Sequence, residues 1–238
     1  MPEATSLVLG AFLETGRGKY STHNSFENAP SVRGSRDSSY DDGGLLARWD
    51  MSNAGLRGVA LESSFRAGSV EEDFSSGDLT DGLGNGARYD LSSPYYGAHA
   101  GVTFSCNLTR TVFMTSYARF LWNCVEKERA IIGGNEVTFH VLDSHRPQGG
   151  ARFHYKAAPA VRPYVGVGYE WECNGTSRAV TYGNEIAAPS LRGGTGPLEA
   201  GVVFRVTEEK PVFLDLGVKG YAGKREGVSG NIQLKLAF

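Results

Sequence analysis

The end of the chain, residues 228–238, alternates strictly between two kinds of position. A period of two is typical of a β-strand with one apolar and one polar face. The run matches the ~9–11 residues that a tilted strand needs to cross the hydrocarbon core of a bilayer. We therefore predict a terminal strand suited to contact lipid on one side. Its positions that are apolar or lack a side chain are Val228, Gly230, Ile232, Leu234, Leu236 and Phe238.

Similar alternation recurs along the whole chain and predicts about ten strands, each with an apolar and a polar face. Charged side chains fall repeatedly on the polar face. An Arg on the lipid side of a bilayer midplane costs ~2–4 kcal/mol, and this cost is avoided when the polar face points inward. We therefore predict that the charged positions line a wet lumen. They are Glu14, Arg48, Glu62, Arg66, Arg119, Arg152, Glu170, Arg205 and Lys219.

The connections between the expected strands sort by length. Those after even-numbered strands are short, at 52–55, 107–110, 157–160 and 208–210. Those after odd-numbered strands are mostly long and polar, at 17–40, 69–90, 125–136 and 174–192, with 223–226 as the exception. A barrel inserted from one side explains this sorting, with tight periplasmic turns and long extracellular loops. The predicted fold is an all-β, antiparallel, up-and-down transmembrane barrel with both termini periplasmic.

Composition alone does not separate this fold from soluble β-proteins. The net charge is −2 and the pI about 6.2, so we expect no nucleic-acid partner. Mean hydropathy is −0.28, and the longest apolar run, 7–13, is far shorter than a membrane helix. Mean hydropathy and the length of apolar runs do not detect barrel strands, because half of the side chains of each strand face a polar lumen. The alternatives from the residues are a Gly-rich β-sandwich and a lipocalin-type barrel, neither of which explains the loop asymmetry.

The sequence contains no nucleotide, hydrolase or zinc motif, and we expect no cofactor and no metal. Its three cysteines, Cys106, Cys124 and Cys173, have no ligand spacing, and we interpret them as free thiols. Asp143 and His145 lie two residues apart on one face of a strand. Outer-membrane proteases of the omptin type use an Asp/His pair, but His145 falls on the lipid-facing side. Pro147 cannot donate to a strand ladder and predicts a bulge or a local gap.

Several segments resemble the carboxy-terminal translocator domain of autotransporters, the proteins of type V secretion. The most specific is 220–230, which contains Gly-Lys-Arg-Glu-Gly, and the others are 93–99, 163–166, 188–196 and 10–16. The resemblance implies a twelve-stranded outer-membrane barrel with an α-helix in its lumen, which exports and anchors an upstream passenger. It also implies that the domain is not an enzyme, and that the barrel-assembly machinery reads Leu234, Leu236 and Phe238.

The chain departs from that pattern in two ways. About ten strands are expected here rather than twelve, and neither a signal peptide nor a pore helix is found before Leu7. We therefore expect residues 1–238 to form one autotransporter-type barrel domain in the bacterial outer membrane, without its first strands, pore helix and passenger. The expected partners are outer-membrane lipid, the assembly machinery, and an upstream helix and passenger. A porin-like channel and an omptin-like surface protease remain alternative functions.

Overall fold

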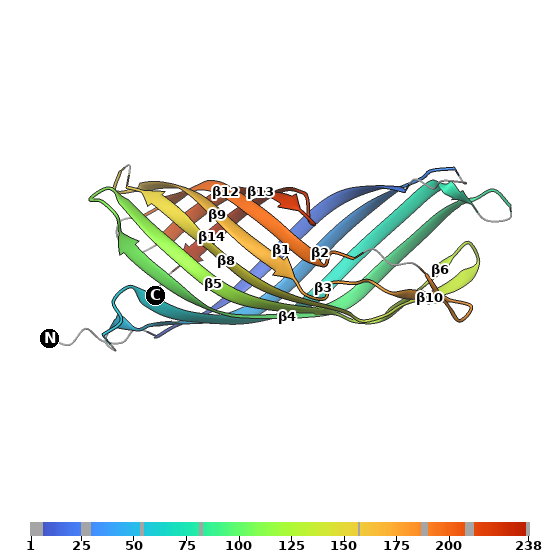
Figure 1. Cartoon of the computed structure of the whole chain (residues 1–238), viewed down its shortest axis with the longest axis horizontal. Coiled ribbons are helices and arrows are strands. Elements are labelled where there is room, and N and C mark those ends of the chain that lie inside the picture. The colour runs from blue at the N-terminus through green and yellow to red at the C-terminus, as the bar shows by residue number, and fades with distance from the viewer. Residues whose placement is uncertain are drawn as a thin grey trace.

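The computed structural model describes residues 7–24, 30–52, 55–80, 83–156, 158–186, 190–207 and 212–236. Ten of its strands form one antiparallel sheet, called here the main sheet, in which neighbours in sequence are neighbours in space. They are β1 (Leu7–Asn24), β2 (Val32–Asp50), β3 (Val59–Thr80), β4 (Gly86–Asn107), β5 (Val112–Val125), β8 (Leu142–Tyr155), β9 (Val161–Glu172), β12 (Gly193–Arg205), β13 (Val212–Gly223) and β14 (Gly227–Leu236). These strands run obliquely to the long axis, and the sheet curls around it (Figure 1). The predicted all-β antiparallel fold is confirmed.

Four shorter strands form a second sheet, called here the loop sheet. They are β6 (Glu128–Ile132), β7 (Asn135–Phe139), β10 (Ala179–Thr181) and β11 (Asn184–Ile186), in the order β11-β10-β7-β6. β6 lies within the expected loop 125–136, and β7 begins at its end and continues beyond it. β10 and β11 lie within the expected loop 174–192. The strand pairs β2–β3, β4–β5, β8–β9 and β12–β13 meet in sequence order at the opposite end of the main sheet, called here the turn end (Figure 1). The end that carries the loop sheet is called the loop end.

Most of the described residues of two segments expected as long loops are instead strand. Residues 17–24 and 32–40 continue the β1–β2 ladder as far as Asn24 opposite Val32, and residues 69–80 and 86–90 continue the β3–β4 ladder as far as Thr80 opposite Gly86. Alternation of apolar and polar residues marks a strand only where one of its faces is apolar. These extensions are mostly polar on both faces, so their backbone pairing leaves little periodic signal in the sequence.

The loop sheet packs against the extension of β4. Ala130 and Val137 are buried, and the rings of Tyr89 and Phe139 lie with their centroids 5.5 Å apart. Tyr89 also stacks on Phe74 at 5.1 Å and accepts a hydrogen bond from Arg36 at 2.8 Å. A small second core therefore forms beyond the end of the main barrel wall and holds the loop sheet over the loop end.

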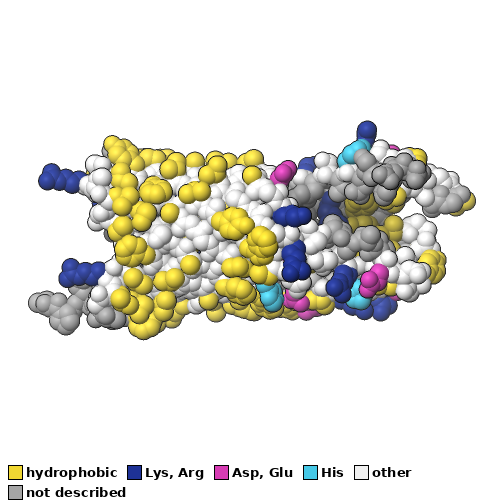
Figure 2. Space-filling view, in the orientation of Figure 1, with side chains coloured by type: hydrophobic (Ala, Val, Ile, Leu, Met, Phe, Trp, Pro, Cys, Tyr) yellow, Lys and Arg dark blue, Asp and Glu magenta, His cyan; other side chains and the backbone are white. Residues whose placement is uncertain are grey.

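The two faces of the main sheet differ in polarity. The outer face is covered by hydrophobic side chains from the turn end to the middle of the molecule, and charged side chains gather toward the loop end (Figure 2). Large apolar residues on this face are well exposed, for example Leu45 at 67% and Ile232 at 80%. A soluble protein would bury such a continuous apolar surface. Within the described ranges, no helix is long and apolar enough to span a bilayer.

The main sheet has two edges. Among the described residues, β1 pairs with β2 alone and β14 with β13 alone, so each presents one row of backbone groups without a ladder partner. The expected gap at Pro147 also occurs. The β8–β9 ladder ends at Gln148 opposite Glu170, whereas the β5–β8 ladder continues through Phe120 opposite Pro147.

Candidate functional site: the inner face of the main sheet

The inner face is the side of the main sheet opposite its exposed apolar residues, and its charged groups form ion pairs across strands. Glu62 on β3 is shared by two arginines. Its Oε1 lies 2.7 Å from Nη2 of Arg119, and its Oε2 lies 3.3 Å from Nη1 of Arg48. Strand register places Arg48, Glu62, Gly101 and Arg119 in one row across β2 to β5. Gly101 leaves the space that lets Arg119 reach across β4, because a Cβ there would lie 2.7 Å from Cγ of Arg119.

A second row has the same arrangement on the other half of the sheet. Arg152, Gly166, Glu199 and Lys219 are consecutive partners across β8, β9, β12 and β13. Arg152 donates two hydrogen bonds to Glu199, from Nε at 2.6 Å and from Nη2 at 2.9 Å, and Lys219 lies 3.6 Å from the same carboxylate. Gly166 leaves room for this bidentate pair, because a Cβ there would lie 2.5 Å from Oε1 of Glu199.

A third cluster joins β1, β2, β3 and β4. Nη1 of Arg66 lies 3.1 Å from Glu14 and 3.2 Å from Asp42. Tyr40 donates a hydrogen bond to Glu14 at 2.7 Å, and Tyr95 donates one to Asp42. Glu14 and Asp42 are therefore each partnered by both a cation and a phenol hydroxyl.

A fourth cluster, near the loop end, contains residues that sequence reasoning missed. Arg225 lies on the β13–β14 turn and contacts Glu170 of β9 at 2.5 Å, while its backbone N–H donates to Thr195 Oγ1 at 3.1 Å. Arg146 Nε lies 3.7 Å from Glu172. The signal that could have found Arg225 is the Gly-Lys-Arg-Glu-Gly segment. Its arginine points inward and ties the last turn to β9, two strands away in the sheet.

Tyrosine rings on the inner face lie over glycines of neighbouring strands. A Cβ at Gly201 would collide with the ring of Tyr164 and would lie 2.5 Å from the carbonyl oxygen of Leu216. The Tyr164 hydroxyl donates to Asp215 at 3.0 Å, so the ring is held flat along the wall. Tyr117 lies over Gly150 in the same way. These pairs keep bulky rings against the wall instead of across the interior.

We expect Gly201→Ala to destabilise the folded protein by about 1–2 kcal/mol, because the added methyl group overpacks the space below Tyr164. Gly220→Ala on β13 is the matched control, since a Cβ there meets no heavy atom within 4 Å. Urea unfolding of both variants in detergent micelles measures the difference. A Gly201→Ala variant as stable as Gly220→Ala would contradict the close approach of ring and glycine.

The remaining predicted site residues have different surroundings. Arg205 lies at the turn end of β12, where its Nε donates to the carbonyl of Thr207 at 3.2 Å. Leu234 is 61% exposed on the outer face of β14. The Leu236 side chain and all of Phe238 lie outside the described residues. All three cysteines are free, as interpreted from the sequence.

Asp143 and His145 do not form a catalytic arrangement at the inner face. His145 packs on Phe120 of the outer face with ring centroids 6.0 Å apart. Asp143 lies on the same face, opposite Cys124 in the β5–β8 ladder. This pair therefore does not face the inner side of the wall near the outer mouth, where the protease hypothesis would need it.

A row of carboxylates crosses the outer face of the β2–β4 extensions beyond the apolar surface. Asp37 is opposite Asp73, and Asp73 is opposite Asp90. A hydrogen bond with Asp90 and the surrounding negative charges raise the pKa of Asp73. In the described part of the chain, no group of His, Cys, Asp or Glu is arranged to hold a metal ion. We assign no site to this solvated row.

Comparison with known proteins identifies the family. The family model described as the autotransporter β-domain matches residues 4–217. The chain belongs to this family. A structural comparison finds the transport unit of the autotransporter AIDA-I from Escherichia coli, at 13% identity and a TM-score of 0.51, over 98% of this chain and 84% of that chain. No curated protein sequence matches the chain.

The autotransporter β-domain family accounts for the main features described above. Its members are outer-membrane β-barrels of type V secretion, which agrees with a sheet whose outer face is apolar and whose inner face is charged. Membership implies a passenger domain as partner. The family is not an enzyme class, in accordance with the placement of Asp143 and His145 on the outer face.

Proposed function

We propose that this autotransporter β-domain exports an upstream passenger, anchors it at the cell surface, and has no enzymatic activity of its own. The proposal rests on one observation: a family-typical sheet with an apolar outer face and an ion-paired inner face. The loop end faces the cell exterior, and the turn end, with the start of β1 and the end of β14, faces the periplasm. Lipid contacts the outer face.

The nine predicted charged residues would line the lumen. Most of their charges are compensated within the wall, as in the rows centred on Glu62 and Glu199. A wall whose fixed charges are already paired presents few strong binding sites to a passing polypeptide. It therefore suits transit, whereas a wall with uncompensated charges of one sign would retain oppositely charged segments.

The two sheet edges support a barrel that includes further strands. A backbone edge in hydrocarbon leaves N–H and C=O groups without partners, each at a cost of several kcal/mol, so a membrane sheet must close. The family pattern of twelve strands would place two more between β1 and β14, and a lumenal helix would connect them to the passenger. The assembly machinery would recognise the terminal strand through Leu234, Leu236 and Phe238.

Export is tested with the complete natural polypeptide that contains these 238 residues, with an epitope placed upstream of residue 1. A second epitope is inserted at Gly134, in the turn between β6 and β7. We expect antibodies to label both epitopes on intact cells. Labelling at Gly134 alone would show a correctly oriented barrel that does not export, and would refute the proposed function without affecting the fold.

The two alternatives give different results. A porin-like channel would give large, steady ion conductance from the isolated chain in planar bilayers, without any upstream segment. A protease would cleave peptides at the surface of intact cells and lose that activity in His145→Ala. We expect neither, because the inner face is lined by ion pairs and His145 packs against Phe120.

A further inference from the structure

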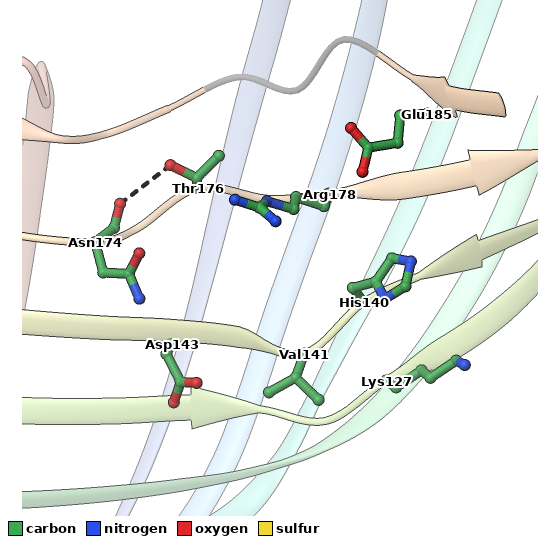
Figure 3. Close-up of a pocket in the computed structure, with 8 residues that line it drawn as sticks. All are labelled: Lys127, His140, Val141, Asp143, Asn174, Thr176, Arg178 and Glu185. Carbon is green, nitrogen blue, oxygen red and sulfur yellow. Dashed lines mark hydrogen bonds between the residues drawn. The ribbon is translucent and has the colours of Figure 1, made fainter.

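A pocket lies at the loop end, where the loop sheet meets β8 and β9 (Figure 3). Its cavity volume is about 420 Å³. Besides His140 and Val141, its lining side chains are six polar groups of complementary kinds: two cations, two carboxylates, an amide and a hydroxyl. They are Lys127, Arg178, Asp143, Glu185, Asn174 and Thr176.

One residue that lines the pocket, Asp143, lies on the outer side of the wall. Asp143 is opposite Cys124, and two residues further along the ladder His145 is opposite Trp122. Residues two apart on a strand share a face, so Asp143 lies on the same side as His145, which packs on the outer residue Phe120.

The pocket also lies at the level of lipid headgroups. Trp122 and Trp171 lie on the outer face near the loop ends of β5 and β9, and such aromatic rings mark the membrane interface. Asp143 is two residues beyond His145, the partner of Trp122, which is roughly 7 Å further from the apolar surface at normal strand rise. The strands remain paired there, since Gly175 N–H donates to the Asp143 carbonyl at 3.1 Å.

The pocket side chains match one class of headgroup. Lys127 and Arg178 provide the cations that bind phosphate. Asp143 and Glu185 would repel a phosphate but accept hydrogen bonds from hydroxyl groups, and Asn174 and Thr176 add neutral polar contacts. A simple phospholipid satisfies the cations and leaves the carboxylates without donors. A phosphorylated sugar satisfies both.

We propose that this pocket binds the phosphorylated sugar headgroup of a glycolipid in the outer leaflet. The proposal shares only the membrane orientation with the proposed function. Bound headgroups would connect the loop sheet to the lipid layer and reinforce its packing on β4. The competing outcomes are that a phospholipid without a sugar, or free phosphate, occupies the pocket.

The test uses the complete natural polypeptide that contains these 238 residues, refolded into phosphatidylcholine vesicles. The probe is a diphosphorylated glucosamine-disaccharide lipid, compared with its dephosphorylated form, with phosphatidylglycerol and with free inorganic phosphate. Binding is measured by Trp fluorescence and by lipid retention in native mass spectrometry. We expect the diphosphorylated glycolipid to bind at least about tenfold more tightly than each of the others. Equal binding of phosphatidylglycerol, of inorganic phosphate or of the dephosphorylated form would overturn the proposal.

Two variants assign the effect to the pocket. Lys127→Gln combined with Arg178→Gln should abolish the preference for the phosphorylated form. Arg129→Gln is the matched control, because Arg129 is an exposed cation of the loop sheet that pairs with Glu136 at 3.5 Å and does not line the pocket. We expect its binding to stay within about twofold of the unmodified chain. Heat-modifiable gel migration confirms folding of each variant. An equal loss of glycolipid binding in the double variant and in Arg129→Gln would refute a pocket-specific site. No passenger is needed, so failed export leaves this result unaffected.

Discussion

Replacing Leu45 by Arg should destabilise the protein in a bilayer by about 2–4 kcal/mol, whereas Leu46→Arg should cost about 1 kcal/mol or less. The two leucines are consecutive on β2 and point to opposite faces of the sheet. Leu45 is 67% exposed on the outer apolar face, so an Arg there would meet hydrocarbon. Leu46 lies beside Gly10 and opposite Ser64 on the inner face, where an Arg can remain hydrated.

The comparison needs folded protein in vesicles and urea unfolding of each variant. Because the same residue is introduced at neighbouring positions, helix or strand propensity and the number of added charges are equal in the two variants. Leu45→Lys should behave as Leu45→Arg does, while Leu45→Phe should be nearly neutral. A greater loss at Leu46 than at Leu45 would indicate an apolar interior and a wet exterior, as in a soluble ligand-binding barrel.

The polarity of the faces could be read from the sequence because it depends only on local alternation. Arg48 and Arg119 alternate along their strands with the exposed apolar residues Trp49 and Phe120, because side chains on a strand repeat every second residue. The ten strands of the main sheet followed from the same signal. The assignment of Leu45 and Leu46 to opposite faces needs no knowledge of the neighbouring strands.

The partners of the charged residues could not be read in this way. Arg152 and Glu199 are 47 residues apart and meet only because Gly166 lies between them in the sheet. Such rows depend on the register of four strands, and a shift of one residue moves each side chain to the other face. The strand extensions were missed for a different reason. Their backbone pairing is retained beyond the apolar surface, where no apolar face marks the period.

Removing the charge of Glu62 should have the second large effect. In Glu62→Gln, the cations Arg48 and Arg119 would lose the carboxylate that they share. Breaking a buried ion pair costs about 3–5 kcal/mol, and partial exposure of both arginines reduces the expected loss to about 2–3 kcal/mol. The Glu62 side chain itself is only 15% exposed, so water replaces it poorly. Urea unfolding in vesicles at low salt measures the change.

Two further variants serve as controls for Glu62→Gln: one at an exposed ion pair and one double variant. Glu136→Gln removes an exposed partner of Arg129 and should cost less than about 0.5 kcal/mol. Arg48→Gln combined with Glu62→Gln should recover part of the loss, because one of the two uncompensated cations is removed. If Glu62→Gln and Glu136→Gln were equally mild, water would screen the inner face as fully as the surface. The rows of ion pairs would then keep the inner face hydrated without contributing to the free energy of unfolding.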